Sequence, residues 1–307
     1  YLDELEQARI EMQLPPGVRY KSELYDERTF PYLTPENIRR WQGYFDRMEK
    51  LAAGDPRTLL NVRKERRELE FATLWRWTDL KEQYPDYFED YEVHADRIRD
   101  VNAALTDGTH VRPLGEAALD EFVLKIKAAA REAPLPPRFA DIDSSRIRQF
   151  VPLRHHGGPR VVAEPDAAFG YVAPVHSPDV PFNFGFYAGE DAPRDRENLP
   201  DLPPDSPLTW HRTMSGTYSL RRELPRDEIT PGQYHLYELG PIDLTPDCMI
   251  WFSNMSWATN LKLGSQLYDP DGDNHWRAWV SMKFDGPTWG GTADEDSVLV
   301  ERIILVK

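Results

Sequence analysis

The 307-residue chain is poor in cysteine and in positive charge. Cys248 is the only cysteine and lies in an apolar run, so no intrachain disulfide can form and a buried thiol is expected. Lys and Arg number 37 against 52 Asp and Glu, which gives a net charge of −15. Both halves are acidic, with net charges of −6 for residues 1–137 and −9 for residues 138–307. We therefore expect no nucleic-acid or anionic-membrane partner, because phosphate binding requires a basic face.

Sequence signals of membrane insertion, secretion and catalysis are also missing. No run approaches 18 apolar residues, so no membrane span is predicted. The opening YLDELEQARIEMQ is polar and helical, unlike a signal peptide. Because the chain starts with Tyr, we expect it to be part of a longer protein that carries the targeting signal elsewhere. No G-x-S-x-G elbow and no P-loop lysine occurs, and no catalytic residue is predicted.

Residues 1–133 have the pattern of a helical bundle. Thr34 and Pro35 provide an N-cap and a first helical proline, and Gly54 ends this first helix. Its apolar stripe, at spacings of three and four, comprises Ile38, Trp41, Phe45, Met48 and Ala52. Further helices are predicted over 57–82, 86–106 and 114–131. The run RKERRELE (63–70) alternates charges at i, i+4, which predicts a solvent-exposed face.

Residues 134–139 are expected to be a proline-rich linker, after which the hydrophobic period changes from 3.6 to 2. Thirteen of the 18 glycines and 17 of the 27 prolines follow residue 137, as many tight turns require. These features predict an antiparallel jelly-roll β-sandwich over 140–307, resembling a carbohydrate-binding module. The fold class is thus two-domain, α then β. Strands are predicted over 147–153, 159–164, 170–175, 182–187, 208–212, 216–223, 233–239, 248–254, 257–264, 276–284 and 297–306.

Tryptophan is concentrated near the C-terminus, where six of the nine occur in the last hundred residues. In WRAWVSMKF (276–284), alternation places a ring, two cations and a hydroxyl on one strand face. Sugars stack their apolar C–H faces on aromatic rings and need polar partners for their hydroxyls. The alternative is that the indoles fill the sandwich core. The candidate carbohydrate-binding residues are Trp251, Trp257, Asn260, Arg277, Trp279 and Lys283.

An Asp-rich turn is the one candidate cation site. Asp269, Asp271 and Asp273 alternate as at the start of a calcium loop, but the glutamate expected near the twelfth position is missing. A hairpin turn explains the same residues. We predict no cofactor and no bound metal, with calcium as the alternative.

Two stretches carry a family resemblance. Residues 34–74 resemble the helical segment that follows the catalytic barrel in a family of bacterial glycoside-hydrolase-like proteins, formerly a domain of unknown function. The tail, QYHLYELGPIDLTPDCMIWFSNMSW (233–257) and WVSMKFDGP (279–287), is similar to the C-terminal β-domain of such proteins. Members include endo-β-N-acetylglucosaminidases. Because the family's catalytic carboxylates belong to the barrel, the resemblance assigns no catalytic residue here.

Three functions follow as expectations. The first is a non-catalytic C-terminal accessory region of a secreted or periplasmic carbohydrate-active enzyme, whose sandwich binds glycan or caps the catalytic barrel of the same protein. The second is a stand-alone sandwich hydrolase or lyase. The third is a structural docking module.

Overall fold

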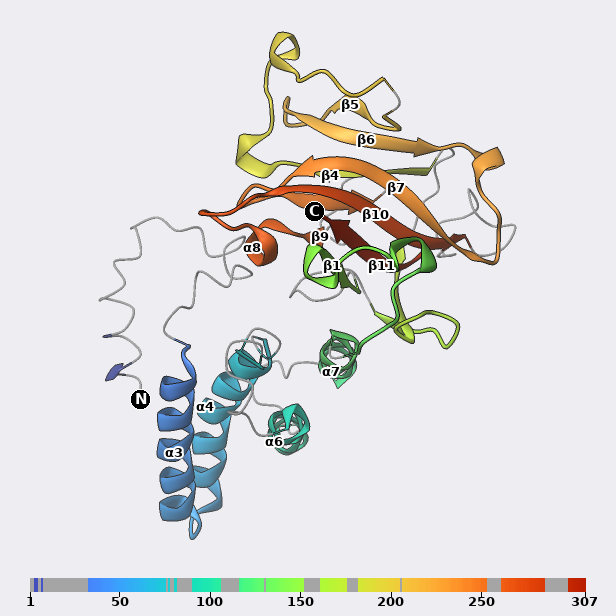
Figure 1. Ribbon diagram of the computed structural model, residues 1–307. Coiled ribbons are helices and arrows are strands. Elements are labelled where there is room, and N and C mark those ends of the chain that lie inside the picture. Colours follow the sequence, from blue (N-terminus) through green and yellow to red (C-terminus); the bar gives the residue numbers. More distant parts are fainter. Residues whose placement is uncertain are drawn as a thin grey trace. The chain divides into compact units, whose positions relative to one another are not determined.

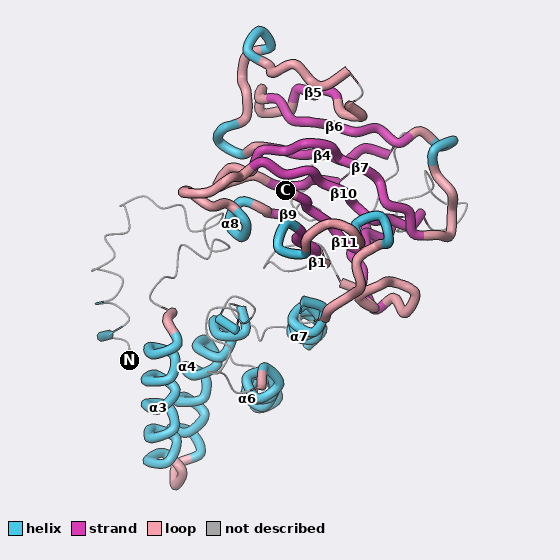
Figure 2. Tube along the Cα trace, in the orientation of Figure 1, coloured by secondary structure: helices cyan, strands magenta, loops and turns pink. Residues whose placement is uncertain are grey.

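The computed structural model describes residues 3–4, 7, 33–75, 77, 80–81, 90–105, 116–129, 131–151, 161–175, 182–204, 206–252, 261–284 and 298–307. The chain divides into two compact units, residues 1–126 and 127–307. Helices make up the first unit and two antiparallel sheets make up the second (Figures 1 and 2). The predicted order of helices followed by antiparallel sheets is therefore confirmed.

The described part of the first unit contains the long helices α3 (Pro35–Ala52), α4 (Pro56–Trp75) and α6 (Tyr91–Ala104), and α7 (Glu116–Ala129) begins in it and ends in the second unit. The predicted N-cap forms, because the Oγ1 of Thr34 accepts a hydrogen bond from the backbone N–H of Asn37 at 3.3 Å. Trp41 and Phe45 from the predicted stripe are fully buried and pack with Leu69 of α4. A second cluster joins α4, α6 and α7 and includes Leu74, Trp77, Ala95, Ile98, Leu119, Val123 and Ile126.

The described residues of the second unit form eleven strands in two sheets. Their bounds are β1 (Ile147–Phe150), β2 (Val162–Ala163), β3 (Tyr171–Val175), β4 (Phe182–Tyr187), β5 (Thr209–Arg212), β6 (Tyr218–Leu224), β7 (Tyr234–Asp243), β8 (Met249–Phe252), β9 (Leu261–Lys262), β10 (His275–Phe284) and β11 (Val298–Val306). The six-stranded sheet has the order β2-β3-β11-β10-β7, with β1 also paired to β11. The five-stranded sheet has the order β5-β6-β4-β8-β9.

The two sheets contact each other through aromatic side chains. Phe182 of β4 and Phe284 of β10 have ring centroids 5.3 Å apart in a T-shaped arrangement. Both rings are fully buried, so these positions define the inner face of each sheet. Alternate positions on β4 and β10 therefore point to the outer faces.

Strand β7 runs four residues past its predicted end, through Gly240 and Pro241. A proline is tolerated there because, among the described strands, β7 is the last in its sheet and pairs with β10 alone. Gly240 adopts a φ of 93°, and the register with β10 shifts between Ala278 and Trp279. This glycine bulge lets the strand continue where the sequence signals suggest a turn.

The predicted linker packs onto the second unit. Phe139, in the 3₁₀ turn Pro137–Phe139, is 2% exposed and belongs to a cluster with Ile147, Trp279 and Ile304. The carbonyl of Pro134 accepts a hydrogen bond from Nη1 of Arg302 at 2.8 Å. Residues 134–139 are thus part of the second unit's packing, and they cover part of the outer face of the six-stranded sheet.

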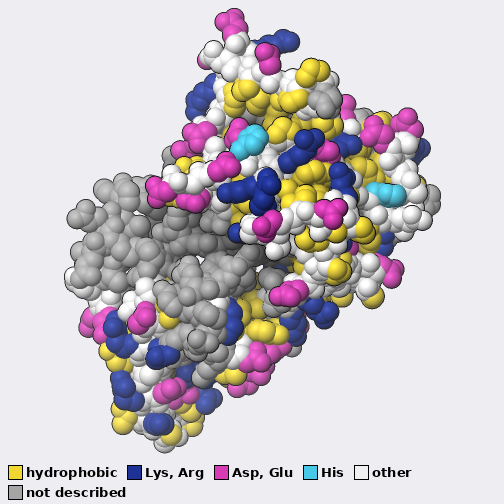
Figure 3. Space-filling model, viewed as in Figure 1, with side chains coloured by type: hydrophobic (Ala, Val, Ile, Leu, Met, Phe, Trp, Pro, Cys, Tyr) yellow, Lys and Arg dark blue, Asp and Glu magenta, His cyan; other side chains and the backbone are white. Residues whose placement is uncertain are grey.

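Charge is mixed on the described part of each unit in Figure 3. On the face that Figure 3 shows, basic and acidic side chains are interspersed on both units. The net charge of −15 is therefore not gathered there into one acidic block.

Candidate functional site

Trp279 lies on the outer face of β10, as its position in the alternating strand predicts, but it is buried. Its side chain is 6% exposed. The ring of Phe139 meets it edge-on with centroids 5.1 Å apart, and the guanidinium of Arg138 lies 5.4 Å from the Trp279 ring centre. A sugar cannot stack on a ring covered in this way.

The two cations of the same strand face are engaged by carboxylates. Nζ of Lys283 lies 2.8 Å from Oε1 of Glu164, and Lys283 is 9% exposed. Arg277 retains an exposed side chain and pairs with Glu238 on β7. Of these three β10 side chains, only Arg277 is presented to solvent.

Trp251 is also buried, at 2% exposed, on β8. It pairs with Gly185 of β4, and its indole lies directly against that glycine's backbone. A Cβ at position 185 would come within 2.7 Å of Cζ2 of Trp251. Trp257 and Asn260, the remaining candidates, lie outside the described residues.

These placements correct the predicted sugar platform. Trp251 and Trp279 lie on strands of different sheets and neither exposes its ring, so the structure does not bring them together as a stacking surface. The period-two pattern assigns the correct face to Trp279, but it carries no information on what covers that face. The covering residue, Phe139, belongs to the segment predicted to be a linker.

The Asp-rich turn uses its carboxylates for local hydrogen bonds. Oδ1 of Asp269 accepts from the backbone N–H of Asp271 at 3.0 Å, and Oδ1 of Asp273 accepts from that of His275 at 2.9 Å. This is the behaviour of Asx turns. In the part of the chain that the structure describes, no three His, Cys, Asp or Glu side chains group closely enough to hold a metal ion. Nor is any described helix both long and apolar enough to cross a membrane.

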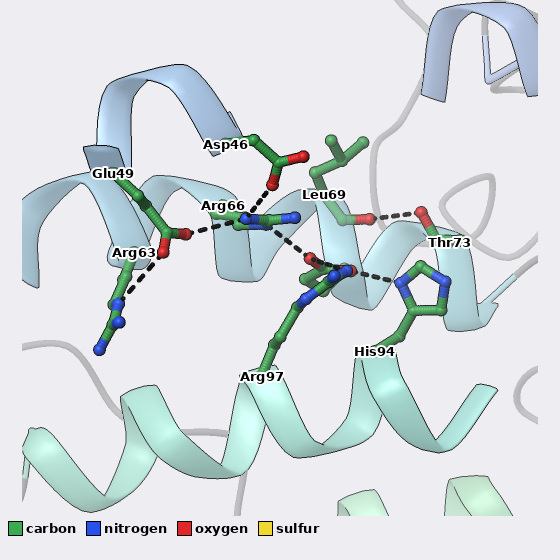
Figure 4. Close-up of polar contacts among 9 residues, drawn as sticks. Asp46, Glu49, Arg63, Arg66, Leu69, Thr73, His94 and Arg97 are labelled. Carbon is green, nitrogen blue, oxygen red and sulfur yellow. Dashed lines mark hydrogen bonds and ion pairs between the residues drawn. The ribbon is translucent and has the colours of Figure 1, made fainter. Parts of the chain in front are cut away.

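A dense polar cluster of the described residues lies in the helical unit, where α3, α4 and α6 meet (Figure 4). Glu70 is its centre and is 0% exposed. Its Oε1 accepts from Nε of Arg66 at 2.8 Å and from Nη1 of Arg97 at 3.2 Å, and its Oε2 contacts Nδ1 of His94. Arg66 also pairs with two carboxylates of α3, Asp46 and Glu49, each at 2.9 Å.

The cluster fixes the ionisation of its central carboxyl. Burial alone would raise the pKa of Glu70, but His94, Arg97 and Arg66 together outweigh burial and lower it. Burial alone would likewise lower the pKa of the Arg66 guanidinium, but its contacts with Glu49, Glu70 and Asp46 raise it. The ion pairs therefore keep Glu70 and Arg66 charged inside the helical unit.

The run 63–70 is consequently only in part the solvent-exposed face that its charges predict, since Arg63, Glu65 and Glu68 are exposed. Arg66, Arg67 and Glu70 are buried. The positions 63, 66, 67 and 70 recur at spacings of three and four, so they lie on one stripe of α4, which faces α3 and α6. One sequence signal could have identified the buried network. Asp46 and Glu49 are three residues apart on α3 and complement Arg66 of α4, and His94 and Arg97 are three residues apart on α6 and complement Glu70 of α4.

A cavity of about 80 Å³ adjoins this network. Its lining contains four arginines, Arg63, Arg66, Arg67 and Arg97, together with Glu49, Glu70, Asp100 and Val101. The arrangement is suited to holding charged groups through hydrogen bonds. Comparison of the chain with protein-family models, with curated proteins and with solved structures finds no significant match.

Proposed function

We propose that this chain is a non-catalytic accessory region of a carbohydrate-active enzyme, in which the two-sheet unit docks onto the catalytic barrel of the same protein. The observation that carries the proposal is the burial of Trp279 beneath Phe139 and Arg138. A ring in that position stabilises a scaffold and does not stack on a sugar. The resemblance of residues 34–74 and of the C-terminal strands to a glycoside-hydrolase-like family supports the enzyme context.

The same proposal includes a jelly-roll arrangement and a secreted or periplasmic location. In support of the jelly roll, the described chain passes between the sheets four times. Strands far apart in sequence, β3 with β11 and β4 with β8, are also neighbours, as a rolled-up sandwich requires. The location rests on the family resemblance alone.

A second candidate function is glycan binding on the outer face of the five-stranded sheet. Arg221 and Trp251 both pair with Gly185, so they lie on the same face, opposite Phe184. Trp251 Nε1, Ser219 Oγ and Arg221 Nε are buried without a hydrogen-bond partner among the described residues. Of these residues Arg221 keeps 28% of its side chain exposed, and a sugar hydroxyl reaching this face could accept a hydrogen bond from it.

His211 belongs to this outer face. It pairs with Ser219, which is two residues from Arg221 on β6 and therefore lies on the same face as Arg221. Burial, with a smaller contribution from the nearby Arg221, lowers the pKa of His211. The imidazole is therefore neutral near pH 7 and can both donate and accept a hydrogen bond.

The docking proposal is tested by sedimentation velocity with the barrel encoded in the same gene. We expect a one-to-one complex with a Kd of about 10 µM or tighter, and no response to a broad glycan panel. A gene that encodes no barrel, or a barrel that sediments independently of the chain, refutes docking.

Glycan binding is tested on the same preparations. Binding that is lost in Arg221→Ala and retained in Arg212→Ala establishes the second candidate. Arg212 is a matched control. It is an exposed arginine of β5, and because it follows His211 directly on the strand, its side chain points away from the outer face.

A further inference from the structure

The charged cavity of the helical unit has the size and the lining of a small-anion site. Its volume of about 80 Å³ is several times the roughly 10–15 Å³ that one water molecule requires. Three of its arginines lie on one stripe of α4, and Arg97 faces them from α6. The cavity lies entirely within the first unit, so it is independent of the sheets and of the docking proposal.

The cavity is accessible from the surface. Arg63 and Arg97 line it and keep 47% and 31% of their side chains exposed. Glu70 and Arg66 form its inner end, at 0% and 7%. A ligand can therefore approach past two partly exposed guanidiniums toward buried ones.

The charge of the lining favours an anion. Four guanidiniums face three carboxylates, those of Glu49, Glu70 and Asp100, which leaves one positive charge in the lining. Two carboxylates outside the lining also pair with its arginines, Asp46 with Arg66 and Glu68 with Arg67. They are 55% and 62% exposed, so solvent screens their charges more effectively than the charges inside.

Arg67 is the lining residue whose bonding is incomplete. Its Nε and Nη2 donate to Oε1 of the neighbouring Glu68, at 3.1 and 2.6 Å. Its Nη1 is buried and has no hydrogen-bond partner among the described residues. The unmet group is therefore a donor, which only an acceptor ligand can satisfy.

We propose that this cavity binds one tetrahedral oxyanion, a phosphate or sulfate group, between the guanidiniums of Arg67, Arg63 and Arg97. Guanidinium groups suit this ligand because their planar forks donate paired hydrogen bonds to phosphate-type oxygens. The group can come from the free ion or from an ester on a sugar, since both present the same oxygens.

Isothermal titration of the full chain tests the proposal, at constant ionic strength maintained with sodium chloride. The ligands are inorganic phosphate, inorganic sulfate and glucose 6-phosphate. Saturable one-to-one binding of phosphate or sulfate identifies the free ion as the source, and binding of glucose 6-phosphate alone identifies the ester. Absence of saturable binding by all three overturns the proposal.

Two variants and a control locate the site. Arg67→Gln and Arg63→Gln should each weaken binding at least about tenfold, because each removes a charged donor. Arg99→Gln is the matched control, since Arg99 is on α6 but pairs with Asp96 and Asp120 and does not line the cavity. Equal binding by Arg63→Gln and Arg99→Gln refutes the assignment even if Arg67→Gln fails to fold.

Discussion

Replacing Trp279 with alanine removes a buried ring from the outer face of the six-stranded sheet. Only 6% of Trp279 is exposed, and its ring packs against that of Phe139 with ring centroids 5.1 Å apart. Trp→Ala changes at such sites cost about 3–5 kcal/mol, and an edge-to-face ring pair contributes about 0.5–1.5 kcal/mol of that. We therefore expect the free energy of unfolding of the second unit to fall by about 4 kcal/mol.

Urea denaturation followed by far-ultraviolet circular dichroism measures this change without relying on tryptophan fluorescence. With an m value of about 2 kcal/mol per M, the midpoint should fall by about 2 M. Arg277→Ala on the same strand face is the control, since its exposed pair with Glu238 should contribute no more than about 1 kcal/mol. A Trp279→Ala midpoint within experimental error of the wild type would refute the structural role of this indole.

Three further predictions concern single side chains. Gly185→Ala should destabilise the second unit by at least about 1–3 kcal/mol in the same assay, because the new Cβ would lie 2.0 Å from the carbonyl of Leu220; an unchanged midpoint would contradict this. Burial raises the pKa of the Cys248 thiol to about 12, so a thiol reagent at pH 8 should modify it only after unfolding, and rapid labelling of the native chain would disprove its burial. Glu70→Gln should cost about 3–5 kcal/mol in the helical unit, because it leaves the surrounding cations without their buried partner. The pKa of Glu70 is lower in the folded than in the unfolded helical unit. Ionised Glu70 therefore stabilises the fold fully above the unfolded pKa of about 4.3, and this stabilisation is lost as pH falls through the folded pKa. Glu70→Gln should remove that loss and flatten the acid side of a plot of stability against pH.

Periodicity and capping account for most of the elements that sequence reasoning identified correctly. Thr34 and Pro35 start α3 at the predicted residue, because the cap and the proline are local signals. Each predicted strand segment overlaps an observed strand, since alternation is also local. The extension of β7 through Pro241 was missed, because its tolerance depends on β7 being at a sheet edge, which is a property of the whole topology.

The candidate site was harder to predict, because burial depends on partners distant in sequence. Trp279 is assigned to the correct face but is covered by Phe139, which is 140 residues earlier and in a segment whose prolines suggested a linker. Arg66 and Glu70 look solvent-exposed as a charged run, and they become buried only because α3 and α6 supply opposite charges. In both cases the local pattern gives the direction of a side chain and not its environment.

Hydrogen exchange of the indole N–H groups tests the account's central claim, that the rings of Trp251 and Trp279 are buried in the two-sheet unit and form no stacking surface for sugars. A chain labelled with ¹⁵N-tryptophan, assigned by single Trp→Phe substitutions, is transferred to D₂O and followed by NMR. We predict that the signals of Trp251 and Trp279 persist after that of Trp210, whose Nε1 bonds Pro200 in an exposed setting, has disappeared. Exchange of Trp251 and Trp279 as fast as that of Trp210 would contradict the account and return both rings to the surface.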